Sequence, residues 1–166
     1  MKRYRGVLNF AIFLAVCAGL IGLVLHFTAH YPALGETVSY PVNEVEGFTL
    51  SIQEPGWSPF RGYTLRYKID IDSEKVYTLT REDSKNFEGL EYFTDGQWHR
   101  LLSQEETVGH MNWDVGGEGV SSFQGSIVQK FAGYGTRLES GTYRLTMELT
   151  DQQGSPHYLA AEFTVK

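Results

Sequence analysis

The sequence has a single cysteine, Cys17, and it lies inside an apolar segment near the N-terminus. An intrachain disulfide is therefore excluded, and so is a metal site built on several thiolates. A domain without disulfides depends on its hydrophobic core for stability. A sufficient core forms more readily in a domain of about 130 residues than in one of about 50. The aromatic content of 14% supplies large side chains for such a core and argues against disorder.

Charged side chains are missing from residues 6–35, and basic side chains are scarce in everything after them. Three of the 14 basic residues are Lys2, Arg3 and Arg5, so residues 36–166 carry 11 basic and 20 acidic side chains, a net charge of −9. A domain of that charge is repelled by a phosphate backbone or an anionic lipid surface. The charge therefore argues against nucleic acid as a partner.

The uncharged segment predicts a transmembrane helix over residues 6–28, in contact with membrane lipid. Asn9 and His26 are its only strongly polar side chains, and each lies near an end. At about 1.5 Å per residue, a helix of this length crosses the ~30 Å hydrocarbon layer. The basic tail, residues 1–5, is expected to stay in the cytoplasm by the positive-inside rule. We therefore expect a single-pass signal anchor in the cell membrane and an extracytoplasmic C-terminal domain.

Two other fates of this segment stay open. A cleaved signal peptide needs an apolar stretch of about 7–15 residues with small side chains before the cleavage site, where Phe27 and Tyr31 stand. A lipoprotein needs a small residue before the acylated cysteine, where Val16 stands. A retained anchor fits better. Small side chains recur at every fourth position, at Ala11, Ala15 and Gly19. This stripe permits self-association through the helix, although such residues are common in membrane helices.

After a linker predicted over residues 29–43, the sequence alternates between apolar and polar side chains. The clearest run has apolar residues at Tyr63, Leu65, Tyr67, Ile69 and Ile71. This period of two is typical of half-buried strands, and it recurs over residues 48–52, 143–149 and 159–165. No segment after residue 30 has a sustained helical period. We predict an all-β domain over residues 44–166, with seven to nine strands in an antiparallel sandwich.

Two local signals support this fold. Asp95-Gly96 separates two short strands and is typical of a two-residue hairpin, because Gly accepts the positive φ of a type I′ turn. Tyr143 follows a glycine-containing turn and opens an alternating strand. Immunoglobulin-like sandwiches often have a tyrosine there whose hydroxyl bonds to backbone a few residues upstream. The alternative is an ordinary core tyrosine.

The chain resembles the bacterial immunoglobulin-like domains of cell-surface and membrane-anchored proteins of Gram-positive bacteria. The resemblance rests on Tyr-Thr-Leu-Arg-Tyr at residues 63–67, the strand–Asp-Gly–Trp pattern at residues 90–98, Gly-Thr-Tyr-Arg-Leu at residues 141–145 and the closing strand at residues 160–165. The chain departs from the family at residues 71–75 and in a glycine-rich loop at residues 111–119. The resemblance implies an extracytoplasmic scaffold or binding module with no catalytic residues to transfer.

The motifs of common chemistries are missing. The sequence has no Gly-x-Ser-x-Gly elbow, no phosphate-binding Gly-Lys-Ser/Thr motif and no paired histidines. Asp70, Asp72 and Glu74 alternate along one strand face, but calcium needs six to eight oxygens, usually gathered by a loop. A solvated strand face is the simpler interpretation. We therefore predict no catalytic residue, no metal and no cofactor.

The segment at residues 54–61 is the strongest candidate for binding. It contains two prolines, which favour a rigid turn, and it presents Trp57, Phe60 and Arg61. Trp and Arg are enriched at binding hot spots, and a rigid loop loses little entropy on binding. Trp113 and Tyr134 are candidates for a similar patch. The alternative is that Trp57 folds back and caps the sandwich.

Three functions from different classes are compatible with these features. The first is a non-enzymatic interaction module that binds a protein or an envelope polymer. The second is an accessory subunit of a membrane complex, with the helix as the contact. The third is a hydrolase acting on the cell envelope. An exposed aromatic patch would favour the first, and two facing carboxylates in a cleft would favour the third.

Overall fold

The computed structural model describes residues 2–27, 29–58, 62–81, 88–102, 111–117, 122–127, 135 and 137–166. These ranges contain one helix, α1 (Lys2–Phe27), and ten strands. The strands are β1 (Ala33–Val38), β2 (Phe48–Ser58), β3 (Gly62–Ile71), β4 (Val76–Arg81), β5 (Glu88–Thr94), β6 (Gln97–Leu102), β7 (Met111–Gly116), β8 (Ser122–Ile127), β9 (Gly141–Thr150) and β10 (Pro156–Val165). The helix and the strands belong to two separate compact units, Met1–His30 and Tyr31–Lys166.

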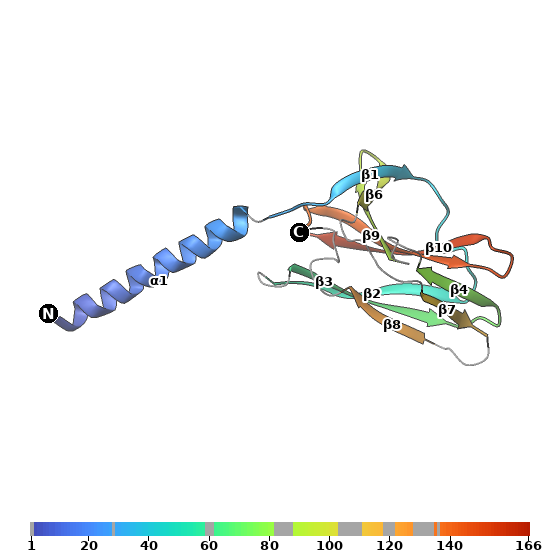
Figure 1. Cartoon of the computed structure of the whole chain (residues 1–166), viewed down its shortest axis with the longest axis horizontal. Helices are drawn as coiled ribbons and strands as arrows, with labels where there is room; N and C mark the ends of the chain where they lie inside the picture. The colour runs from blue at the N-terminus through green and yellow to red at the C-terminus, as the bar shows by residue number, and fades with distance from the viewer. Residues whose placement is uncertain are drawn as a thin grey trace. The chain divides into compact units, whose positions relative to one another are not determined.

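The strands form two antiparallel sheets, and Figure 1 shows β9 and β10 lying over β2 and β3. Sheet A has the order β1-β6-β5-β9-β4-β7, with β10 also paired to β9, and sheet B has the order β2-β3-β8. β4 meets β9 at one described residue pair, Thr78 with Thr150, so the antiparallel β4–β7 pair is an extension of sheet A. The prediction of an all-β antiparallel sandwich preceded by one helix is confirmed.

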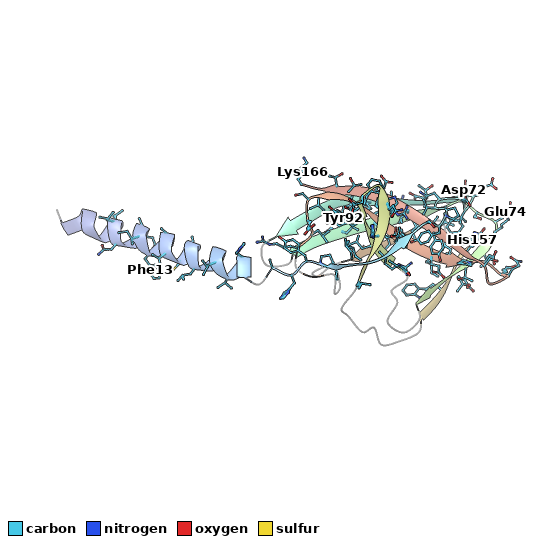
Figure 2. The ribbon with its side chains drawn as sticks, turned by 90° about the horizontal axis from the view of Figure 1, so that it is seen from above. Phe13, Asp72, Glu74, Tyr92, His157 and Lys166 are labelled. Carbon is cyan, nitrogen blue, oxygen red and sulfur yellow. The ribbon has the colours of Figure 1, made fainter. Side chains whose placement is uncertain are left out.

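The helix α1 is apolar on all sides. Its stretch Gly6–Val24 is 19 residues long, which corresponds to about 28 Å at ~1.5 Å per residue. No part of this stretch is buried within the chain, and Figure 2 shows Phe13 projecting from the helix. The predicted helix is therefore long and apolar enough to cross a membrane.

The core lies between the sheets and is built from the inward-facing members of the alternating strands. On β3, Leu65 is 0% exposed, whereas Lys68 and Asp70 face out and form an ion pair. Burial of each large apolar side chain contributes about 1.5–3 kcal/mol. The fully buried apolar side chains are Leu65, Leu79, Leu90, Leu145, Met147, Leu149 and Leu159. The predicted alternation is thus confirmed in β3, β9 and β10.

The two local predictions hold. β5 and β6 form a hairpin in which Asp95 and Gly96 have φ values of 53° and 78°, as a type I′ turn requires. Tyr143 is 2% exposed at the start of β9, and its hydroxyl donates a hydrogen bond to the carbonyl of Glu139 at 2.8 Å. The hydroxyl of this core tyrosine therefore fixes the turn that leads into β9.

Three sequence predictions about the organisation were wrong. Residues 29–43 are not only a linker, because β1 pairs with the edge of β6 and satisfies backbone groups that would otherwise be unpaired. The glycine-rich segment at residues 111–119 contains β7, because its glycines lie at the end and leave residues 111–116 free to pair with β4. With these strands, the described ranges contain ten strands, whereas seven to nine were expected.

Candidate functional site

The predicted binding turn at residues 54–61 is largely strand. β2 extends to residue 58, and Trp57 is held in the ladder with β3. The ladder shifts register beside Pro55, because a proline has no N–H to donate to the neighbouring strand. The expectation of a rigid turn beginning at residue 54 is therefore wrong. Phe60 and Arg61 lie outside the described residues, and a binding role for Trp57 stays a prediction.

Of the other two predicted binding residues, Trp113 lies within the described part of the chain. Trp113 lies on β7, opposite Leu79 of β4, and is 36% exposed. Tyr134 lies outside the described residues. Trp57 belongs to sheet B and Trp113 to sheet A.

A feature that sequence reasoning missed lies on the outer face of sheet A, where charges alternate across four strands. Arg100 of β6 lies opposite Glu91 of β5. Glu91 lies opposite Arg144 of β9, which in turn lies opposite Glu162 of β10. We call these four residues the charge row. Opposite charges on directly paired residues of neighbouring strands attract each other.

The middle of the charge row is buried although it faces away from the core. Glu91 is 0% exposed and Arg144 is 6% exposed. The Nε atom of Arg144 donates to Glu91 Oε2 at 2.5 Å, and the hydroxyl of Thr146 is 3.5 Å from Glu91 Oε1. Two desolvated charges are tolerated only when they are well paired, so neither residue can be replaced singly without a large cost.

Aromatic side chains enclose this ion pair. The guanidinium of Arg144 lies 4.4 Å from the ring centre of Trp98 and 5.7 Å from that of Tyr40. Trp98 in turn contacts Phe93, with ring centres 5.1 Å apart, and Phe93 is 42% exposed. Cation–π contacts of this kind contribute about 0.5–2 kcal/mol. Tryptophan and arginine therefore adjoin an exposed phenylalanine on the outer face of sheet A.

Tyr40 covers the other side of the ion pair and comes from the segment after β1. Its hydroxyl donates a hydrogen bond to Glu91 Oε1, and its ring stacks on Tyr158 with centres 3.9 Å apart. Burial, followed by the hydrogen bond to Glu91 and the negative charge of that carboxylate, raises the pKa of Tyr40 to about 12. Tyr40 is therefore a neutral hydrogen-bond donor at physiological pH.

A second cluster of ionisable groups shapes the β9–β10 turn. The carboxylate of Asp151 accepts hydrogen bonds from the backbone N–H groups of Gln153 and Ser155, at 2.9 and 2.8 Å. Its other oxygen lies 3.1 Å from Nε2 of His157. The bond to His157 and then the backbone bonds lower the pKa of Asp151. Each of these contacts stabilises the β9–β10 turn. His157 lies toward the same end of the domain as Asp72 in Figure 2, but no contact between the two is described.

In the charge row, the buried carboxylate of Glu91 is paired with an arginine and not with a second carboxylate. An acid–base pair for glycoside cleavage needs two carboxylates on either side of the scissile bond. The buried carboxylate here instead faces Arg144, accepts hydrogen bonds from hydroxyl groups and interacts with the charge of Arg100. An ion pair so enclosed holds neighbouring aromatic side chains in place. No protein-family model and no curated protein matches this chain.

Proposed function

We propose that the protein is a non-enzymatic, membrane-anchored module whose extracytoplasmic immunoglobulin-like domain binds a protein or an envelope polymer. The observation that carries the proposal is the outer face of sheet A, where an exposed Phe93 packs on Trp98, and Trp98 packs on Arg144. Trp and Arg are enriched at binding hot spots, and side chains held by their neighbours lose little entropy on binding.

The membrane placement is supported by the two ends of the helix. α1 is long and apolar enough to span a bilayer, and the charges before residue 6 are all positive. By the positive-inside rule, this arrangement supports a cytoplasmic N-terminus and a sandwich outside the membrane. The acidic domain, with a net charge of −9 over residues 36–166, would be repelled by an anionic membrane surface.

The strand order supports an immunoglobulin-like assignment. In that fold, strands A, B and E pair in one sheet, and strands C, F and G pair in the other. Here β2-β3-β8 and β5-β9-β10 have the same chain order and neighbours. The hydrogen bond from Tyr143 to Glu139 at the start of the penultimate strand is a second shared feature. Both are compatible with the bacterial surface domains that the sequence resembles.

Photo-crosslinking in the membranes of cells that make the protein tests the proposal. A benzophenone amino acid replaces Phe93 in one variant, Trp113 in a second and the exposed turn residue Gln152 in a control. We expect one recurrent partner to be crosslinked from position 93, to be missing from position 152, and to be lost when Trp98 is changed to Ala. Crosslinks that join position 93 only to other parts of the same chain would overturn the proposal.

A further inference from the structure

Residues 39–43, which we call the strap, leave β1 and cross the outer face of sheet A. The strap is attached mainly through the side chains of Tyr40 and Asn43, and its other residues are exposed or half-buried. None of the strap's side chains belongs to the hydrophobic core. The strap therefore resembles a bound peptide more than a part of the sandwich.

The place that the Tyr40 side chain occupies on sheet A, which we call the hollow, fits the polarity of a phenol. Three small residues, Gly89, Thr146 and Ala160, lie opposite one another on β5, β9 and β10, and the Thr146 hydroxyl is 3.5 Å from Glu91 Oε1. Tyr158 supplies a ring to stack on at 3.9 Å. At the inner end, the buried carboxylate of Glu91 accepts the hydrogen bond of the hydroxyl. An apolar ring without the hydroxyl would leave that carboxylate with one acceptor site unfilled.

Asn43 attaches the strap to β10, mainly through its side chain. Its side-chain Nδ2 donates to the carbonyl of Ala160 at 3.0 Å, and its Oδ1 accepts from the N–H of Ala160 at 2.8 Å. Its backbone N–H donates to the carbonyl of Tyr158 at 2.8 Å. Two of these three bonds come from the amide side chain, which takes the place of a peptide group at this edge, and Asn43 itself has a φ of 61°.

We propose that the hollow is a phenol-binding site, occupied in the resting protein by Tyr40 of the strap, and that the tyrosine side chain of a partner protein can replace it. Exchange requires only that the strap lifts off, since the core side chains of β9 and β10 have no part in it. Lifting off exposes the Glu91–Arg144 pair and the edge of β10 together. The inference does not depend on the partner sought above, because its test uses a small phenol.

The first experiment uses p-cresol, the side chain of tyrosine as a free molecule, with the full chain in nanodiscs. In the Tyr40→Ala variant the hollow is empty, so p-cresol should bind with a Kd on the order of 1 mM and raise the melting temperature. Toluene at equal concentration, which lacks the hydroxyl, should raise it far less. The double variant Tyr40→Ala/Tyr158→Ala, which has lost the stacking ring, controls for uptake into the lipid. Equal effects of p-cresol and toluene would reveal an ordinary apolar cavity and overturn the proposal.

The second experiment uses the unmodified chain and does not depend on any variant folding. Hydrogen exchange of the strap, residues 39–43, should be faster in p-cresol, because the phenol competes with Tyr40 and favours the lifted strap. Exchange within β9 should not change. In Tyr40→Phe, which keeps the ring, the same residues should exchange about 10-fold to 100-fold faster without any ligand. If β1, the strap and β9 exchange at one common rate in all conditions, the strap does not lift off on its own and the proposal is wrong.

Discussion

The substitution Arg144→Met tests whether the charge row stabilises the sandwich. Methionine is unbranched like arginine but carries no charge, so the carboxylate of Glu91 loses the Nε contact at 2.5 Å. Because Glu91 is 0% exposed, water cannot replace that contact without opening the structure. Breaking a buried ion pair in this way costs about 3–5 kcal/mol. The cation–π contact with Trp98 at 4.4 Å adds about 1 kcal/mol.

A loss of about 4–6 kcal/mol is a large part of the ~5–15 kcal/mol that stabilises a typical domain. Urea unfolding of the full chain in detergent, followed by tryptophan fluorescence, measures it directly. With a slope of about 2 kcal/mol per molar urea, the midpoint should fall by about 2–3 M. The Lys68→Met variant is the matched control, because its ion pair with Asp70 is on the surface and should contribute less than about 1 kcal/mol.

The double variant Glu91→Met/Arg144→Met separates loss of the pair from exposure of an unpaired charge. Replacing both ions with apolar side chains removes the buried charge, so the double variant should be more stable than Arg144→Met alone. It still leaves the Tyr40 hydroxyl without its acceptor, which costs about 1–3 kcal/mol. Adding Tyr40→Phe should recover part of that loss. If Arg144→Met lowers stability by less than about 1 kcal/mol, or the double variant is as unstable as the single one, the reasoning fails.

Three further predictions concern single sites. Tyr143→Phe removes the hydrogen bond to Glu139 and should cost about 0.5–1.5 kcal/mol in urea unfolding; an unchanged midpoint would contradict a role for this hydroxyl. Gly47→Ala should cost at least twice as much as Gly154→Ala, because both have φ near +80° but an added Cβ at Gly47 would lie 2.1 Å from a backbone oxygen, whereas at Gly154 it meets nothing within 4 Å. Equal losses of stability in the two variants would show that the backbone around Gly47 moves to make room for the added Cβ. Since the pKa of Tyr40 is raised to about 12 from an unfolded value of about 10, the stability it contributes should be complete below pH 10 and lost as pH rises through 12. Unfolding midpoints measured across this range should show a smaller alkaline loss in Tyr40→Phe, and an identical loss in both proteins would contradict the assignment.

The sandwich could be predicted from the sequence because its signals are local. The alternation along β3 and β9 assigns each side chain to a face, and the Asp95-Gly96 pair determines the β5–β6 turn without knowledge of any distant residue. Even the hydrogen bond of Tyr143 spans only four residues. In each of these cases the residue types and their spacing carry the information.

The charge row could not be predicted in the same way. Glu91 occupies a polar position of an alternating strand, and such a position is normally solvated. It is buried because Tyr40, 51 residues away, and Arg144, 53 residues away, lie over it. The residues around Tyr40 have no alternation, so the sequence indicated a linker there. A sequence pattern alone does not show which distant segments cover a strand face.

The charge row also explains why sheet A adopts a single register. A slip of one residue between β5 and β9 would turn Arg144 into the core, and the apolar inner face excludes it. A slip of two residues would keep apolar side chains inward, because Tyr143, Leu145, Met147 and Leu149 all face the core. That slip, however, places Glu91 opposite Thr142 or Thr146 and separates the buried carboxylate from Arg144, the counter-ion that donates a hydrogen bond to it. The alternating pattern therefore selects the inner face, and the buried ion pair selects one register from those that the pattern allows.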